Sequence, residues 1–299
     1  MKGILLVDKP AGMTSHDVVD RIRRAARMKR VGHTGTLDPA ATGLLILCLG
    51  PATRLSEHFT GLEKTYEGTM RLGIETASYD LDGEIVAEKP VPDLDVAAIQ
   101  RQCAPFTGQI QQVPPMVSAV KVDGERLYKL ARKGEIVERP ARSVLVRAFD
   151  VLSYDAPDAR VRVTCSSGTY VRSLCHDVGQ AIGCGAALAS LRRLAVGRHR
   201  IEDALPLEAL TSPDSVAAHL LPMGNALDLP AGVLEDDALP ALANGNPISS
   251  RNLVGGCPVS HGWLQLKNRA GDLLALCMVE PAGLESLVHP KRVFFNDRS

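Results

Sequence analysis

Gly32-His-Thr-Gly-Thr-Leu-Asp38-Pro-Ala-Ala-Thr-Gly43 contains a single carboxylate, that of Asp38, among three glycines, a histidine and a proline. Pro39 restricts the residue before it to an extended or turn conformation, so we expect Asp38 on a stiff loop. The apolar residues 44–49 that follow predict a buried strand. A lone carboxylate on a stiff loop beside a strand is suited to meeting a substrate. The alternative is an Asx turn, in which Asp38 only bonds its own backbone.

Hydrophobic periodicity places further candidate residues on helices and strands. A helix is predicted from Ser15, as its cap, to about Met28, with a basic stripe on its outer face. Alternation over residues 65–75 predicts a strand that turns Tyr66 inward. A second helix begins near residue 169 and carries Arg172 in its first turn, where a cation opposes the helix dipole. A nearby carboxylate would explain that cation, and a solvated surface arginine is the alternative.

Charge and cysteine content limit the function classes. Lys plus Arg and Asp plus Glu both number 34, whereas a nucleic-acid binder is expected to show a basic footprint. Residues 21–30 nevertheless hold six basic groups and no acid, and such a local patch can bind phosphate. A solvated helix face is the alternative.

Seven cysteines without a CxxC pair indicate neither a zinc site nor a disulfide framework. We expect no secretory signal and no membrane span, hence a cytoplasmic protein.

Five segments together resemble one family. Besides residues 32–43, they are residues 3–15, 64–66, 114–121 and 165–174, and the likeness extends from residue 3 to about 200. In this order they resemble the TruB-type tRNA pseudouridine(55) synthases. The resemblance implies an α/β (α+β) catalytic domain over residues 1–228, with a mixed, largely antiparallel sheet flanked by helices. Within it, residues 113–142 would form an insertion that contacts RNA.

Residues 229–299 resemble, more loosely, a small PUA-like RNA-binding β-barrel. Strand patterns at 263–267 and 273–279 flank a glycine-bearing loop, which predicts a hairpin. A generic β-domain that only packs against the catalytic part is the alternative.

The chemistry that the resemblance implies is a redox-neutral isomerisation that needs neither metal nor cofactor. The bond between ribose C1′ and uracil N1 breaks, the base turns, and C5 joins C1′. Asp38 would be the catalytic carboxylate, which attacks C1′ or C6 or removes the C2′ proton. Arg172 would keep Asp38 ionised and oriented. Tyr66 would stack on the uracil and assist proton transfer at C5.

The resemblance also implies substrate-binding residues. His33 would be a wedge that keeps the target uridine everted, although a histidine bonded to its own loop is an equal alternative. Asp80 would lie near the flipped nucleotide, with a turn role as its alternative, and Lys9 would support the floor of the site. The remaining pocket or phosphate contacts would be Tyr170, Leu191, Lys121, Arg126 and Lys129.

The sequence therefore predicts an enzyme that isomerises uridine 55 in the T-loop of tRNA after flipping the base. We expect a monomer that needs no obligate protein partner and does not bind membranes. Two alternatives stay open: an RNA-guided relative that modifies ribosomal RNA, and a tRNA-folding chaperone that uses the same cleft. The set of Asp38, Tyr66 and Arg172 argues against a loss of chemistry.

Overall fold

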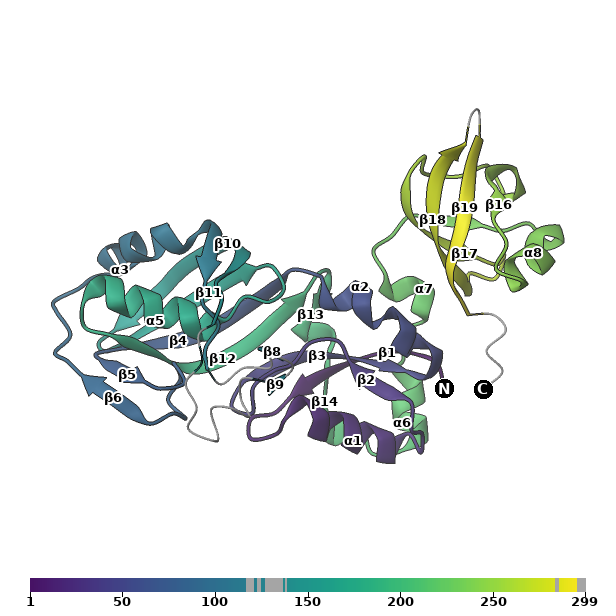
Figure 1. Cartoon of the computed structure of the whole chain (residues 1–299). Helices are drawn as coiled ribbons and strands as arrows, with labels where there is room; N and C mark the ends of the chain where they lie inside the picture. Colours follow the sequence, from purple (N-terminus) through teal and green to yellow (C-terminus); the bar gives the residue numbers. More distant parts are fainter. Residues whose placement is uncertain (117–120, 123–124, 127–136, 138, 283–284, 295–299) are drawn as a thin grey trace.

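The computed structural model describes residues 1–116, 121–122, 125–126, 137, 139–282 and 285–294. Its body is a ten-stranded mixed sheet, drawn in purple to teal in Figure 1. Along the sheet the strands are β14 (Leu205–Pro206), β1 (Gly3–Lys9), β3 (Thr42–Leu49), β12 (Ala186–Val196), β4 (Lys64–Leu72), β11 (Asp158–Cys165), β10 (Arg142–Asp155) and β7 (Gly108–Gln112), with β2 (Val31–His33) beside β3 and β13 (His199–Arg200) beside β12. Only the β1–β14 and β3–β12 pairs are parallel, so the predicted mixed, largely antiparallel sheet is confirmed.

The centre of the sheet is the short parallel contact between β3 and β12. It consists of Arg192 opposite Thr42 and Arg193 opposite Gly43. A Cβ atom on Gly43 would lie 2.3 Å from the backbone oxygen of Arg193, and the φ of Gly43 is +101°. Glycine is therefore required here, because any side chain would push β12 away from the loop that carries Asp38.

Helices cover two parts of the sheet. Helix α1 (Ser15–Ala25) packs on β1 and β3, whereas α3 (Val96–Cys103) and α5 (Val171–Ile182) pack on β4, β10 and β11 (Figure 1). A short helix, α2 (Ser56–Thr60), follows β3 and a 3₁₀ turn. Among the described residues, no helix is long and apolar enough to cross a membrane.

Helix α1 differs from the sequence prediction at both ends. Its cap is Thr14, whose hydroxyl accepts a hydrogen bond from the Asp17 backbone while the Asp17 carboxylate accepts one from the Thr14 backbone. Ser15 is instead buried, and its hydroxyl oxygen accepts a hydrogen bond of 2.8 Å from the Leu37 backbone. The helix ends at Ala25, because Arg27 takes a positive φ of 51°. The predicted cap at Ser15 was wrong, since that hydroxyl holds the Asp38 loop.

The C-terminal part is a curled five-stranded sheet that forms a half-barrel, compatible with a PUA-like domain (yellow-green in Figure 1). Its strands are, in order, β15 (Ala231–Val233), β17 (Gly262–Lys267), β18 (Leu273–Ala282), β19 (Glu285–Val293) and β16 (Ile248–Ser249). The predicted hairpin over residues 263–279 is confirmed by the antiparallel pairing of β17 with β18. The division of the chain after residue 228 stays a prediction.

The half-barrel shares a hydrophobic cluster with the body. Leu276 and Phe294 belong to the same buried cluster as Leu55 and Phe59 of the body. The guanidinium of Arg54 also lies 4.7 Å from the centre of the Phe294 ring. The C-terminal part therefore covers apolar side chains that the body would otherwise expose.

We predict that removing residues 230–299 leaves the body folded but less stable. Leu55 and Phe59 would lose part of their cover, which costs about 2 to 4 kcal/mol by area, and the midpoint of thermal unfolding should fall by several degrees. A control chain that ends after Phe294 keeps this cluster and should melt like the full chain. A truncated body that melts at the full-length temperature would contradict the shared cluster.

Candidate active site

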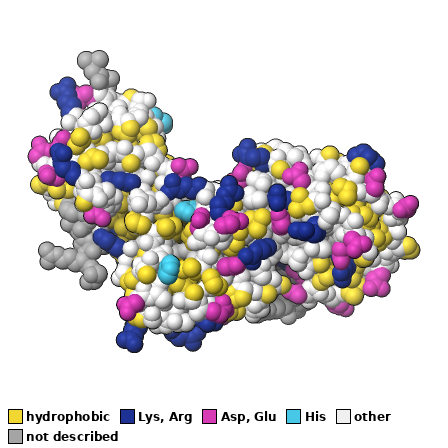
Figure 2. Space-filling model, turned by 180° about the vertical axis from the view of Figure 1, so that it is seen from behind, with side chains coloured by type: hydrophobic (Ala, Val, Ile, Leu, Met, Phe, Trp, Pro, Cys, Tyr) yellow, Lys and Arg dark blue, Asp and Glu magenta, His cyan; other side chains and the backbone are white. Residues whose placement is uncertain are grey.

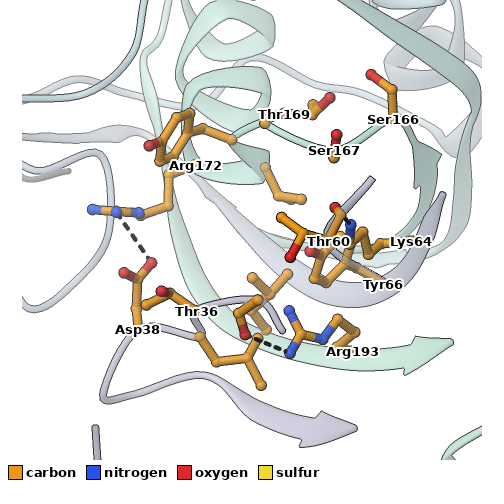
Figure 3. A pocket seen from close by; sticks show the side chains of 16 residues that line it. Thr36, Asp38, Thr60, Lys64, Tyr66, Ser166, Ser167, Thr169, Arg172 and Arg193 are labelled. Carbon is orange, nitrogen blue, oxygen red and sulfur yellow. Dashed lines mark hydrogen bonds and ion pairs between the residues drawn. The ribbon is translucent and has the colours of Figure 1, made fainter. Parts of the chain in front are cut away.

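A pocket with a volume of about 280 Å³ opens where three of the five noted segments meet. Its walls are residues 35–38, residues 166–172, the start of β4 and the middle of β12 (Figure 3). Asp38, Tyr66, Tyr170, Arg172 and Leu191, which were all predicted as site residues, line it. The structure thus brings side chains from positions 38 to 191 into one cavity.

Asp38 and Arg172 form an ion pair across the pocket, with Arg172 Nη2 3.1 Å from Asp38 Oδ2 (Figure 3). The Arg172 side chain is only 4% exposed, so the alternative of a surface arginine is wrong, whereas Asp38 is 46% exposed at the pocket. Partial removal from water raises the pKa of Asp38, and the Arg172 cation opposes that rise. The pair therefore keeps a carboxylate available to a ligand while fixing its direction.

Arg172 also binds a second carboxylate. Its Nη1 lies 2.9 Å from Asp80 Oδ2 and donates to the Ser78 backbone oxygen at 3.1 Å. The Ser78 hydroxyl in turn donates to Asp80 Oδ1 at 2.5 Å. Asp80 thus has both the predicted turn contact and a place beside the site, where it lines an adjoining pocket with Asp38. Two carboxylates explain why a buried cation is tolerated in the first turn of α5.

The Lys9 side chain holds the backbone of the loop after Asp38 in place. Its side chain is fully buried, and Nζ donates to the backbone oxygens of Pro10 (2.8 Å), Pro39 (3.1 Å) and Ala41 (2.7 Å). Burial lowers the pKa of Lys9 to about 8. Because Ser15 holds Leu37 and Lys9 holds Pro39, the backbone is fixed on both sides of Asp38.

Tyr66 and Tyr170 are positioned by neighbours of different kinds. Burial raises the pKa of Tyr66, while the Arg193 cation and a hydrogen bond from it act in the opposite direction. The buried Gln112 side chain clamps the Tyr170 backbone: the Tyr170 N–H donates to Oε1 at 2.8 Å, and Nε2 donates to the Tyr170 oxygen at 3.0 Å. The Tyr66 side chain and the Tyr170 backbone are therefore each held by a polar contact to a buried side chain.

Two buried cations in the pocket, Lys64 and Arg193, were not predicted from the sequence. Lys64 is 6% exposed and Arg193 is 2% exposed. The sequence nevertheless contained a signal for Arg193. It lies two residues from the predicted pocket residue Leu191, and residues two apart on a strand point to the same face. Lys64 likewise shares a face of β4 with Tyr66.

The remaining predicted residues lie elsewhere. His33 is the last residue of β2 and is not one of the described residues that line the pocket. Its buried Nδ1 has no hydrogen-bond partner among the described residues. Burial lowers the pKa of His33. The backbones of Lys121 and Arg126 are paired in register between β8 (Lys121–Val122) and β9 (Glu125–Arg126). Lys129 lies outside the described residues.

On the face shown in Figure 2, basic and acidic side chains are interspersed over the body of the chain. Pairs such as Arg162 with Glu67 and Arg71 with Asp158 join neighbouring strands of the sheet. Contacts to a polyanion would therefore depend on local groups rather than on a field of one sign.

Comparison with known proteins places the chain among modification enzymes. Residues 23–171 match the family "TruB family pseudouridylate synthase (N terminal domain)", and residues 172–228 match "tRNA pseudouridylate synthase B C-terminal domain". The tRNA pseudouridine synthase B of Opitutus terrae is 52% identical over 210 residues, which cover 70% of this chain and 87% of that protein. The protein of that name from Xanthomonas campestris is 47% identical over 245 residues, or 81% of this chain and 80% of that one.

Solved structures show the same fold. A chain of an H/ACA RNP bound to a substrate RNA containing 2′-deoxyuridine aligns with a TM-score of 0.75 and 24% identity, covering 98% of this chain and 84% of that one. A chain of a Cbf5-Nop10-Gar1 complex aligns with a TM-score of 0.74 and 26% identity, covering 97% and 84%.

The double pairing of Arg172 leads to a stability prediction. Arg172→Ala should lower the free energy of unfolding by about 3 kcal/mol, because it leaves Asp80 in a largely buried position without its cation. Adding Asp80→Asn should restore part of that loss, since an amide carries no charge. Urea unfolding measures both, with Arg71→Ala as the control for an exposed pair, which should cost less than about 1 kcal/mol. Equal losses for Arg172→Ala and Arg71→Ala would contradict the pairing.

Proposed function

The chain belongs to the TruB family of pseudouridylate synthases, and on that premise we propose that it isomerises uridine 55 in the T-loop of tRNA. Its activity as a tRNA pseudouridine synthase, an isomerase, follows from the family and from relatives about 50% identical. The position of the uridine, the role of Asp38 and the flipping of the base belong to the proposal. The contact between Asp38 and Arg172 inside the pocket is the observation that carries it.

The reaction exchanges one glycosidic bond for another. The C1′–N1 bond breaks and its electron pair stays on the uracil, which turns so that C5 can bond to C1′. C5 then loses its proton and N1 gains one, so atoms and electrons balance without a cofactor. Asp38 takes part as a nucleophile, whose bond to the substrate breaks again by the end of the reaction, or as the base that removes a ribose proton and later returns it. Arg172 holds Asp38 ionised and directed at the ribose.

Tyr66 and Leu191 line the pocket on neighbouring strands, and we assign them the uracil ring. A flat ring between an aromatic and an aliphatic side chain would be held by stacking on one face and by apolar contact on the other. Tyr66 would also assist proton transfer at C5, and Tyr170 would close the side of the pocket next to Arg172. Asp80 acts on the nucleotide through Arg172.

Uridine inside a folded T-loop must leave its stack to reach this cavity, which costs a few kcal/mol. His33, and basic groups at Lys121, Arg126 and Lys129, would contribute contacts to the everted RNA that offset this cost. Residues 229–299 would contact the RNA backbone as a PUA-like domain. We further infer that the protein acts in the cytoplasm as a monomer with tRNA as its partner.

The RNA-guided alternative has weaker support. The solved H/ACA chains are about 25% identical to this chain, whereas the tRNA pseudouridine synthase B relatives reach about 50%. A chaperone without chemistry is disfavoured because Asp38, Tyr66 and Arg172 line one pocket.

Purified protein incubated with an unmodified tRNA transcript, with no other RNA or protein, should form pseudouridine at position 55 alone. Asp38→Asn should abolish turnover, because an amide is neither a useful nucleophile nor a base, yet bind tRNA as tightly or more tightly. Position-resolved pseudouridine mapping and a binding titration measure the two effects.

Asp20→Asn, which removes an exposed carboxylate from α1, is the matched control and should keep the wild-type rate. A requirement for a guide RNA, or modification at another position, would refute the substrate assignment. More than trace turnover by Asp38→Asn would refute the role of Asp38.

A further inference from the structure

Lys64 and Arg193 form a pair of buried cations, called here the cation pair, in the wall that faces Asp38 and Arg172. Figure 3 shows them beside Tyr66 and apart from the Asp38–Arg172 contact. They are 6% and 2% exposed, and they project from the neighbouring antiparallel strands β4 and β12. The pocket therefore has one wall with the carboxyl group of Asp38 paired to Arg172 and a second wall with two basic side chains.

The hydrogen bonds of the cation pair go to groups without a formal charge. Lys64 Nζ donates to the backbone oxygens of Thr60 at 2.5 Å and Leu62 at 2.6 Å. Arg193 donates from Nε to the Leu44 oxygen at 2.7 Å and from Nη2 to the Gly35 oxygen at 3.1 Å, and it bonds the Tyr66 side chain. These bonds orient both cations but do not neutralise them.

No carboxylate among the described residues forms an ion pair with Lys64 or Arg193. Besides Arg193, the titratable group that acts on Lys64 is Cys165 on β11, whose thiol has a pKa raised by burial to about 11 and is therefore neutral. Burial and the neighbouring Arg193 lower the pKa of Lys64 to about 8, which still leaves it mostly charged at neutral pH. Two buried charges without a counter-charge are strongly unfavourable, so a negative ligand is expected.

The proposed reaction supplies that negative charge. A uridine ring is neutral when it enters the pocket, but it receives the electron pair of the C1′–N1 bond when that bond breaks. The resulting uracil anion spreads its charge over N1 and the two ring oxygens. The base receives this electron pair whether Asp38 attacks C1′ or C6 or removes a proton from C2′; after attack at C6 the negative charge is carried by the base while it is bonded to Asp38.

We propose that Lys64 and Arg193 are the electrostatic site that stabilises the uracil anion while it is detached from the ribose. The inference rests on the proposed function, and it adds a role that Asp38 and Arg172 do not fill. Fixed positive groups in a dry cavity stabilise developing charge strongly, because they need no reorganisation during the reaction. When C5 bonds to C1′ and loses its proton while N1 gains one, the ring is neutral again and can leave.

The test compares single-turnover rates and tRNA dissociation constants for Lys64→Met and Arg193→Met. Each should react about 100-fold more slowly, as when one oxyanion-hole donor is removed, with unchanged tRNA affinity because the bound base is still neutral. Arg193→Lys retains the charge and should recover most of the loss. Arg162→Met, which removes an exposed arginine of β11, is the matched control and should keep the wild-type rate.

If Lys64 and Arg193 instead bound a phosphate group of the tRNA, their Met variants would behave differently. Lys64→Met or Arg193→Met would then weaken tRNA binding and reduce the slope of log affinity against log salt by about one, which would overturn the proposal. Rates near wild type in folded Met variants would overturn it too. A wild-type protein that forms no pseudouridine would instead refute the proposed function.

The pH profile keeps the proposal testable if the Met variants fail to fold in thermal melts. Since Lys64 must be protonated, the wild-type single-turnover rate should be high below its pKa of about 8 and fall as pH rises above it. Lys9 has a similar pKa, so Lys9→Arg serves as the control and should retain the fall. A rate that stays flat through this range, or a fall that disappears in Lys9→Arg, would overturn the role of Lys64.

Discussion

The guanidinium of Arg172 joins three parts of the chain that are far apart in the sequence. From the first turn of α5 it binds Asp38 on the loop before β3, and it binds Asp80 in the turn before β6 (Ile85–Glu88). A buried cation in the first turn of a helix is unfavourable unless carboxylates compensate it, so these segments can pack only in this arrangement. Lys9 then fixes the loop after Asp38 through hydrogen bonds to its backbone oxygens. The direction of the Asp38 carboxylate thus depends on two buried cations, Arg172 and Lys9.

The parallel contact between β3 and β12 positions the second wall of the pocket. Because Gly43 lacks a side chain, β12 can approach the Asp38 loop, and this brings Leu191 and Arg193 opposite the start of β4. Tyr66 then lies beside Lys64 and Arg193, in the cationic wall of the pocket (Figure 3). The tasks that we propose for these residues, binding the base and stabilising charge, would therefore fall to neighbouring strands, which are more rigid than surface loops.

Local patterns in the sequence predicted much of this fold but few of its long-range contacts. The stiff loop and strand around Asp38, the start of α5 and the C-terminal hairpin all follow from proline, glycine and periodicity, which act over a few residues. The contact of Arg172 with Asp80 joins positions 92 apart, and no local pattern encodes it. Lys64 and Arg193 were missed because charged residues are expected at surfaces, although each lies two residues from a predicted pocket residue on the same strand. The alternation of residues in the half-barrel strands likewise shows that one face is buried, but not that it covers Leu55 and Phe59.

The most direct test of the account is the single-turnover rate of Arg172→Lys on saturating tRNA across a range of pH. Lysine keeps the charge but cannot bond Asp38 and Asp80 with separate nitrogens, so the rate should fall by roughly 100-fold. Since Asp38 must be ionised and Arg172 holds its pKa down against burial, the loss of rate at low pH should move to higher pH. A wild-type rate with an unmoved acid limb would contradict the claim that Arg172 directs the catalytic carboxylate.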